Sequence, residues 1–310
     1  MRTLFLACAI GLCAIAQLAP AQAAVPPLPT PQRSFDAGSL HVDVYGTSGR
    51  QPMIFIPGLT VGPWEWAGEI RDFSPQYTIY ALTLPGFDGR TGAQSPLFAT
   101  VAADSWTMLQ THGVSKPIVI GHSLGGTLAL LLATQHPDRL AAVVALEGLP
   151  ILPGSDRMTP PQREAQAASI KNQMAAATPE QFEAFSRAYT LPSMVTSSAD
   201  VDAIASASAR SNPAVSGEWF YEDSLLDVRP GLKNATVPIL EIAPFDAAVD
   251  PKSQGSRPTA AAKQAYYASL LANAPNAKVV VVQPARHFAM YDQPAEVHTA
   301  IADFLHSHGL

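Results

Sequence analysis

The chain has almost no cysteine, and this absence excludes several kinds of chemistry. Its 310 residues include two cysteines, Cys8 and Cys13, and both lie within the first 24 residues. If this N-terminal segment is removed, the mature chain cannot form a disulfide. It then has neither a thiolate nucleophile nor a cysteine ligand for a metal ion. A catalytic nucleophile must come from another residue type.

The sequence is also poor in charge and lacks a basic patch. Lysine and arginine number 19 against 25 acidic residues, a formal net charge of −6, and the basic residues do not cluster. Nucleic-acid-binding faces need such clustering, so we expect no nucleic-acid partner. The glycine pattern of dinucleotide-binding folds and metal-ligating clusters are missing too. We therefore expect no cofactor and no metal ion.

The long apolar run of the chain is confined to its N-terminus. Arg2 precedes an apolar stretch at residues 4–18, and a small-x-small cleavage pattern follows at residues 21–23. These features predict a secretory signal peptide cleaved after Ala23 or Ala24. The apolar stretch is about 15 residues long, whereas a membrane-spanning helix needs about 20, so a membrane anchor is the weaker alternative. We expect a periplasmic or secreted protein without a stable membrane span after cleavage.

Hydrophobic periodicity predicts strands that alternate with helices on both sides of a central insertion. Strands are expected at residues 39–45, 53–56, 77–82, 117–120, 140–146, 237–243 and 277–282, and helices of the core at 98–112, 124–136, 258–273 and 294–306. Most of the strands are continuous apolar runs, as in strands buried on both faces. This pattern is typical of an α/β protein with a mostly parallel central sheet and helices on both faces.

The alternation stops between residues 151 and 235, where alanine, serine and glutamine dominate. Polar caps and prolines predict helices there at about 160–177, 179–189, 199–210 and 213–226. Thr178, Pro179 and Gln181 form a capping-box pattern at the start of the second of these helices. A helical insertion between two strands is expected to form a lid over the sheet. We divide the chain into a signal peptide (1–24), a first core part (25–150), a helical lid (151–235) and a second core part (236–310).

The residues from Gly121 to Gly125 read G-x-S-x-G, with Ser123 at the centre. An apolar strand ends at Ile120, and a helix-forming run begins at Thr127. This strand, turn and helix predict a nucleophile elbow, in which small neighbours let strand and helix approach closely. The N-terminus of the helix then faces the serine and favours developing negative charge.

A serine nucleophile needs a general base. In a sheet of this kind the loop after the last strand ends beside the elbow, and that loop carries His287. The other histidines nearby, His298, His306 and His308, fall in the terminal helix and tail. We predict Ser123 as the nucleophile and His287 as the general base.

The third catalytic group should be a carboxylate that orients the histidine and stabilises its protonated form. Glu147 directly follows the apolar strand at 140–146, whereas Asp246 and Asp250 follow the strand at 237–243. Both loops lie at the carboxyl edge of the sheet, where sites of such sheets form. A charge beside a long apolar strand is costly unless it is paired.

The mature chain resembles the α/β-hydrolase family over nearly its whole length, and three motifs carry the resemblance. They are Ile56-Pro57-Gly58-Leu59, the elbow from Gly121 to Gly125, and the block from His287 to Pro294. The resemblance implies the α/β-hydrolase fold with a helical lid and the activity of a serine hydrolase or esterase. It also implies that the backbone N–H groups of Leu59 and Leu124 form the oxyanion hole.

The resemblance bears on the choice of acid as well. Many relatives carry G-x-x-D after the strand that follows the lid, but Pro244 stands at the usual glycine here and Asp246 is one position out. Other relatives, the haloalkane dehalogenases among them, place the acid directly after the strand before the lid, and Glu147 matches that position. The preferred triad is therefore Ser123, His287 and Glu147, with Asp246 as the alternative acid. A serine at the elbow argues against dehalogenase chemistry.

The expected reaction is hydrolysis of a carboxylic ester through an acyl-enzyme intermediate. A large lid rich in aromatic and methionine residues favours a small-molecule or lipid-like ester with apolar groups. Trp64 and Trp66, which follow the oxyanion loop, are candidates for the pocket wall, and core packing is their alternative role. The same groups could also serve a lactonase, thioesterase, amidase or carbon–carbon bond hydrolase. A non-catalytic ligand-binding protein of this fold is a further alternative.

Overall fold

A computed structural model describes residues 24–250 and 257–310. The expected signal peptide lies outside the described residues except for Ala24. Eight strands form one sheet: β1 (Arg33–Ala37), β2 (Leu40–Gly46), β3 (Pro52–Ile56), β4 (Thr78–Thr83), β5 (Ile118–His122), β6 (Ala142–Leu146), β7 (Ile239–Pro244) and β8 (Ala277–Val282). Their order is β1-β2-β4-β3-β5-β6-β7-β8, with β1 and β2 antiparallel to their neighbours and the rest parallel. The prediction of a mostly parallel α/β sheet is confirmed.

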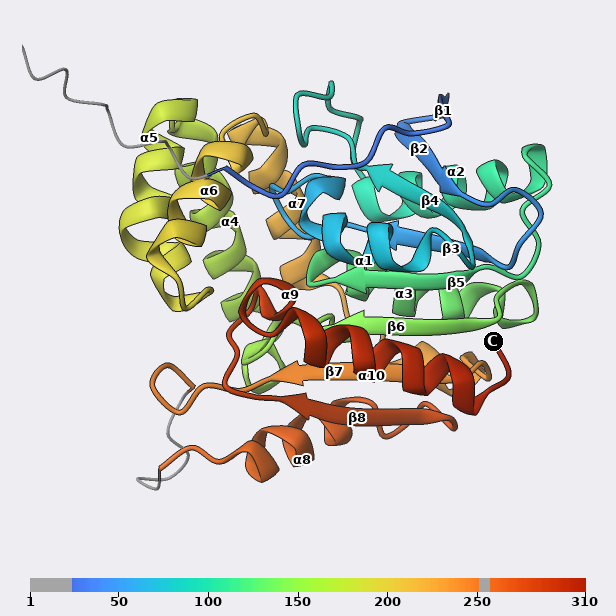
Figure 1. Cartoon of the computed structure of the whole chain (residues 1–310). Coiled ribbons are helices and arrows are strands. Elements are labelled where there is room, and N and C mark those ends of the chain that lie inside the picture. The colour runs from blue at the N-terminus through green and yellow to red at the C-terminus, as the bar shows by residue number, and fades with distance from the viewer. Residues whose placement is uncertain (1–23, 251–256) are drawn as a thin grey trace, which may run out of the picture.

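Helices cover both faces of this sheet (Figure 1). The α-helices of the core are α1 (Ala67–Phe73), α2 (Leu97–Thr111), α3 (Leu124–Gln135), α8 (Ala260–Leu270), α9 (Ala289–Asp292) and α10 (Pro294–Ser307). Helices α2, α3 and α8 pack on one face, and α1 and α10 pack on the other. Strand β5 explains the continuous apolar runs, because Val119 faces the first layer while Ile118 and Ile120 face the second.

Strand β1, helix α1 and the four-residue helix α9 were missed from the sequence. Strand β1 pairs with β2 across a turn at Gly38, whose φ of +60° suits glycine. Because β1 is an edge strand with mostly exposed residues, it carries no continuous apolar signal. Helix α1 is only seven residues long and follows directly after a 3-10 turn at Pro63–Trp66, so its periodicity is too short to recognise.

Between β6 and β7 the chain forms an inserted helical region at the end of the sheet towards which the parallel strands point (Figure 1). It contains α4 (Pro160–Ala176), α5 (Pro179–Phe185), α6 (Ser198–Ser208) and α7 (Pro213–Leu225). The expected capping box is present, since the Gln181 N–H donates to the Thr178 hydroxyl at 3.2 Å and the Thr178 N–H donates to the Gln181 side chain at 3.0 Å. The helix predicted to reach residue 189 ends at Phe185 and continues as a π-helical turn over Ser186–Thr190.

Helix α7 joins this insertion firmly to the core. The carboxylate of Glu222 accepts hydrogen bonds from the first two N–H groups of α2, at Leu97 (2.7 Å) and Phe98 (3.0 Å). The fully buried Trp219 donates its indole N–H to the carbonyl of Pro85 at 3.1 Å. On its other side α7 meets α4 closely, because a Cβ at Gly217 would lie 2.9 Å from a backbone oxygen of α4. The position of α7 is thus set by the core and by α4 together.

Among the described residues, none of the helices is both long and apolar enough to cross a bilayer.

Candidate active site

Ser123 lies at the sharp turn between β5 and α3. Its backbone has φ of +52° and ψ of −122°, a conformation that residues other than glycine rarely adopt. The Ser123 N–H donates to the carbonyl of Leu146 at 2.9 Å, which ties the turn to the end of β6. Backbone strain of this kind persists only where the surroundings enforce it, and it is concentrated at functional sites.

Glycines make the turn possible. A Cβ at Gly121 would overlap the carbonyl of Gly125, and a Cβ at Gly125 would overlap the backbone of β3. A Cβ at Gly126 would lie 2.6 Å from the Cα of Gly148. Three strands and one helix therefore meet at backbone distance around Ser123, as the spacing of the motif predicts.

Glu147 and His287 lie side by side at the carboxyl edge of the sheet. The Nδ1 atom of His287 is 2.6 Å from Oε2 of Glu147. Glu147 directly follows β6 with a φ of +47°, and its N–H donates to the carbonyl of Ile242 in β7 at 3.0 Å. The end of β6 thus aims this carboxylate at the loop after β8. The structure brings His287 together with the preferred acid.

Two residues of α8 that the sequence did not single out complete the surroundings of Glu147. The hydroxyl of Tyr267 donates to Oε1 of Glu147 at 2.8 Å, and Nζ of Lys263 lies 3.1 Å from the same oxygen. Lys263 also contacts Asp250 at 2.9 Å. Lys263 and Tyr267 are four residues apart, so they share one helix face. That spacing is a readable signal, but only the tertiary structure shows which strand end the face meets.

These contacts keep Glu147 ionised. Burial by itself would raise its pKa, but the hydrogen bond and charge of His287, with Lys263 and Tyr267, lower the pKa of Glu147 to about 2. An ionised carboxylate can only accept a hydrogen bond, so Nδ1 of His287 carries a proton and donates it. The other ring nitrogen, Nε2, is then free to act as a base.

The alternative acid, Asp246, has a different set of contacts. Its carboxylate accepts from the guanidinium of Arg286 at 2.7 Å and from the N–H of Ala248 at 2.9 Å. Arg286 in turn donates to the carbonyls of Pro192 (2.7 Å) and Val195 (3.2 Å) in the inserted region. Asp246 therefore anchors the residue next to His287 and links it to the lid, whereas Glu147 contacts the histidine itself.

A second glutamate–histidine pair lies directly behind the first. Nδ1 of His122 is 2.9 Å from Oε2 of Glu65, and Nε2 of His122 is 3.0 Å from the carbonyl oxygen of His287. The N–H of Gly58 donates to Oε1 of Glu65 at 2.9 Å. The pair therefore connects the loop after β3 with the main chain at His287.

Burial and the hydrogen bonds of this second pair together indicate where its proton lies, because burial keeps the His122 ring neutral. A carbonyl oxygen can only accept, so Nε2 of His122 must donate to His287, and Nδ1 of the neutral ring must accept. Glu65 must then carry the proton and donate it to His122. Burial supports this arrangement, because it raises the pKa of Glu65 well above its ordinary value and lowers the pKa of His122 to about 4.

The two residues predicted to supply the oxyanion donors lie in the cavity wall. Leu59 and Leu124 line the same cavity as Ser123, and Leu124 is the first residue of α3. Because Glu65 holds the N–H of Gly58, the loop that carries Leu59 is fixed from behind. The N-terminus of α3 adds its positive dipole end at the same place.

Ser123 and His287 open into a cavity of about 670 Å³ between the sheet edge and the lid. Its wall is mainly apolar and comes largely from the insertion. The apolar lining includes Ile170, Met174, Phe182, Leu191, Met194 and Phe220. A volume in this range is usual for sites that bind small molecules.

Trp64 and Trp66 do not line this cavity, so their prediction as pocket walls is wrong. Trp66 is fully buried, and its ring packs 5.2 Å from that of Phe55 in β3. Trp64 is 4% exposed and belongs to the same core layer. The turn after the oxyanion loop points these side chains inward under the sheet, where burial of their large apolar surface is favourable.

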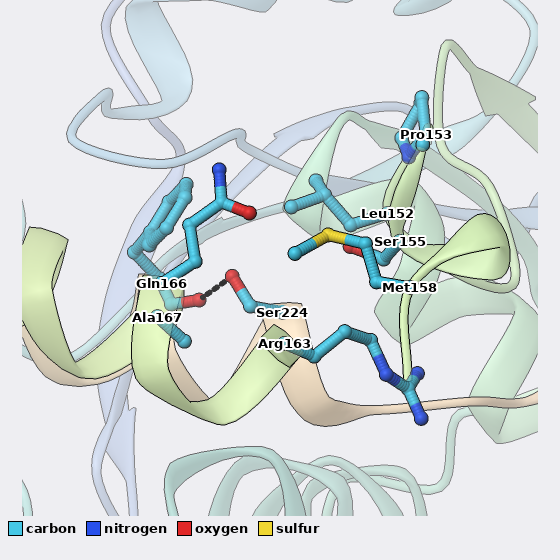
Figure 2. Close-up of a pocket in the computed structure, with 10 residues that line it drawn as sticks. Leu152, Pro153, Ser155, Met158, Arg163, Gln166, Ala167 and Ser224 are labelled. Carbon is cyan, nitrogen blue, oxygen red and sulfur yellow. Dashed lines mark hydrogen bonds between the residues drawn. The ribbon is translucent and has the colours of Figure 1, made fainter. Parts of the chain in front are cut away.

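A smaller pocket of about 190 Å³ adjoins the main cavity, and the two share Leu152 and Phe220. Figure 2 shows this pocket between the loop after β6 and the helices α4 and α7, with Arg163 and Gln166 on the α4 side. Both hollows are therefore lined by residues of α4 and α7.

The chain matches a family model described as the alpha/beta hydrolase fold over residues 51–200. Among curated proteins it is similar to the lipase LipV of Mycobacterium tuberculosis, with 36% identity over 118 residues, which cover 37% of this chain and 44% of the lipase. It is also similar to epoxide hydrolase 4 of Mus musculus, with 28% identity over 109 residues, which cover 34% of this chain and 30% of that protein. The chain thus matches less than half the length of these relatives.

Solved structures agree over a longer stretch. An esterase from Thermogutta terrifontis has a TM-score of 0.72 and 16% identity, covering 89% of this chain and 99% of the esterase. An enol-lactonase from Burkholderia xenovorans LB400 has a TM-score of 0.68 and 17% identity, covering 86% of this chain and 96% of the lactonase. Identities this low show the fold alone. The matched family model, the topology of the sheet and these structural similarities show that the chain has the alpha/beta hydrolase fold.

Proposed function

We propose that this chain is a serine hydrolase that cleaves carboxylic esters. The observation that carries the proposal is the 2.6 Å contact between His287 and the ionised Glu147, in a loop that faces the same cavity as the elbow serine. Acyl transfer requires a histidine oriented by a buried carboxylate and a serine nucleophile, and here His287 and the strained Ser123 line one cavity. The similarity to the lipase LipV supports the same reaction class.

The proposed reaction has two halves. Ser123 Oγ attacks the ester carbonyl carbon while Nε2 of His287 takes its proton. The carbonyl oxygen becomes an anion that accepts hydrogen bonds from the N–H groups of Leu59 and Leu124. His287 then gives the proton to the leaving alkoxide, which leaves an acyl-enzyme on Ser123. Water attacks this acyl group with His287 again as the base, and the acid product and free serine are released. Glu147 stays ionised throughout.

The cavity supports an apolar, small or lipid-like ester as substrate. Leucine, isoleucine, methionine and phenylalanine side chains surround most of the space above Ser123. Removing apolar groups of the substrate from water there favours binding by about 25 cal/mol per Å² of buried surface. Phe185 lines the cavity yet is 59% exposed, and its ring lies 5.3 Å from that of Tyr189, itself 73% exposed. These aromatic residues place an apolar surface at the cavity mouth.

We also propose that the protein acts in the periplasm or outside the cell. The proposal rests on the signal-peptide pattern of the first 24 residues. N-terminal sequencing of the protein recovered from its native cell envelope tests it. A mature N-terminus at Ala24 or Val25 is expected, and a protein that retains Met1 in the cytoplasm would contradict it.

A serine-directed phosphonate and a series of p-nitrophenyl esters from acetate to dodecanoate test the ester hydrolase. We expect the phosphonate to label Ser123, and Ser123→Ala to lower kcat by at least about 10⁴-fold with unchanged folding. Ser269→Ala, on the exposed side of α8, is the control and should retain full activity. A folded wild-type protein that neither reacts with the phosphonate nor turns over any ester would overturn the proposal.

A further inference from the structure

Helix α7 places one carboxyl group in the wall of the cavity above Ser123. Asp223 lines this cavity and is only 8% exposed. The lining residues within the described chain include no lysine or arginine, and the other acid–base groups there are His122 and His287, which Glu65 and Glu147 already hold. Asp223 is thus an isolated carboxyl group in a mainly apolar space.

Nothing in the described protein satisfies this carboxyl. Its Oδ1 atom is fully buried and has no hydrogen-bond partner there. Burial raises the pKa of Asp223 to about 7, and no neighbouring charge offsets that effect. A buried acceptor without a partner costs stability, so a group of this kind calls for an explanation.

The adjacent polar residues of α7 are satisfied within the protein. Glu222 binds the N-terminus of α2, and the hydroxyl of Ser224 donates to the carbonyl of Phe220 at 2.7 Å (Figure 2). Trp219 and Glu222 also fix α7 to the core. Asp223 is therefore held in place by the helix that carries it, with its side chain in the cavity wall and its Oδ1 atom without a partner among the described residues.

We propose that Asp223 accepts a hydrogen bond from a donor group on the substrate, a hydroxyl or an ammonium on the arm of the ester that lies against α7. This inference rests on the proposed ester hydrolysis. Above pH 7 the ionised form of Asp223 dominates, and it accepts and never donates, so it selects donors. The amides and hydroxyls of Gln173, Gln181 and Ser208 in the same wall can do both. An analogue with a methyl group at that position leaves the buried carboxyl unpaired, and sites of this kind reject such analogues strongly.

Matched esters test the proposal on both arms. To test the acyl side of the ester, we would use the p-nitrophenyl esters of 6-hydroxyhexanoic, 6-aminohexanoic and heptanoic acids. The same hydroxyl, amino and methyl ends would also be placed on acyl chains that are one and two carbons longer. On the alcohol arm the matched esters are the hexanoates of 1,6-hexanediol, 6-aminohexan-1-ol and heptan-1-ol. We expect kcat/KM of the wild type to favour at least one donor ester over its methyl-ended match by about tenfold or more. Asp223→Leu should reduce that ratio to one or below.

Asp223→Asn distinguishes the two kinds of donor. Its amide oxygen still accepts from a hydroxyl but carries no charge, so a hydroxyl preference should survive in part and an ammonium preference should disappear. Ser224→Ala is the matched control on the same helix, and it should leave every ratio unchanged.

The melting temperature of Asp223→Leu distinguishes a role of Asp223 in substrate binding from a purely structural role. Replacing an unpaired buried carboxyl by an apolar group of similar shape beside open cavity space should keep or raise Tm, so we expect Asp223→Leu to be at least as stable as the wild type at pH 8. A purely structural carboxyl would lower Tm in that variant and leave the donor ratio unchanged.

The proposal is overturned if the wild type prefers the methyl-ended ester on both arms at every length, or if the ratios are the same in Asp223→Leu. Calorimetry can test the role of Asp223 independently of ester hydrolysis. It would measure the binding of 6-aminohexan-1-ol, 1,6-hexanediol and heptan-1-ol. Absence of turnover and of Ser123 labelling would defeat the proposed reaction. The affinity ratios of these alcohols in the wild type and Asp223→Leu would still decide the role of Asp223.

Discussion

Two glutamate–histidine pairs lie next to each other in this molecule, and they hold their protons in opposite ways. The rings of His122 and His287 are 4.5 Å apart, and each has a glutamate within hydrogen-bond distance. In the inner pair, Glu65 and His122, the proton lies on Glu65 and both groups are neutral. In the outer pair, Glu147 and His287, the glutamate is ionised and can stabilise a positive charge on the histidine.

The difference comes from the surroundings of each carboxyl. Glu65 is fully buried and its contacts are the N–H of Gly58 and the ring of His122. Glu147 has Lys263 and Tyr267 beside it as well as His287. Burial without a cation makes the neutral form of a carboxyl the stable one, whereas a cation and several donors favour the ionised form. Residue type alone therefore does not tell which glutamate serves catalysis.

Glu147→Gln should break the outer pair and cause the largest loss of kcat among the substitutions in the two pairs. An amide cannot stabilise the imidazolium, and its N–H₂ group can force His287 into the wrong tautomer. We expect kcat for p-nitrophenyl butyrate to fall by about 10³- to 10⁴-fold. Asp246→Asn is the comparison, and a loss of no more than about tenfold is expected because Asp246 acts through Arg286. If Asp246→Asn is the crippling change and Glu147→Gln is mild, the assignment of the acid is wrong.

Substitutions of Glu65 should distinguish a neutral pair from an ionised one. In Glu65→Gln the side-chain oxygen can still accept from Gly58, and the amide N–H can donate to Nδ1 of His122, as the protonated acid does. We expect kcat to stay within about threefold. Glu65→Leu leaves both partners unsatisfied in the interior and should cost about 1–3 kcal/mol for each in the free energy of unfolding. Urea unfolding and kcat of both variants check this, and a Glu65→Gln variant as inactive as Glu147→Gln would contradict a neutral inner pair.

The smallest expected effect is a dependence of stability on pH. Because the pKa of Glu65 is higher in the folded state than in the unfolded state, its stabilising contribution is complete below about pH 4.5 and is lost as the pH rises. Glu65→Gln lacks this titration, so its stability relative to the wild type should increase between pH 5 and 8, by about 1 kcal/mol or more. Urea unfolding at three pH values measures the trend.

The outer pair should behave in the opposite sense. The pKa of Glu147 is about 2 in the folded state, so its contribution is complete above its ordinary pKa of 4.5 and is lost as the pH falls from there towards 2. Glu147→Gln should therefore differ most from the wild type above pH 4.5, with a difference that shrinks at lower pH. A difference that instead grows with acid would contradict an ionised Glu147.

Much of the fold was accessible from local patterns. The strands of the core were found because apolar residues on both faces make continuous runs, and Val119 with its neighbours in β5 is an example. The elbow at Ser123 was found because its glycines stand at fixed spacing between a strand and a helix. Edge strand β1 was missed because a half-exposed strand carries a weak apolar signal.

The site depended more on distant contacts. Ser123 and His287 could be named because the nucleophile is defined by the local motif and the base by its place after the last strand. The choice between Glu147 and Asp246 could not be made in the same way, since both follow strands at one sheet edge. Trp64 was misplaced because a tryptophan near an oxyanion loop can point to either side of the sheet.

Spacing along short stretches of chain predicted the α/β alternation, the elbow at Ser123 and the histidine that we propose as its base. The contact of Glu147 with His287, the approach of Lys263 and Tyr267 to the same carboxylate and the place of Asp223 in the cavity wall emerged only from the folded chain. The physical reason is that a carboxyl group's charge and role depend on burial and on partners from remote segments. Those partners become neighbours only when the sheet and its lid are assembled.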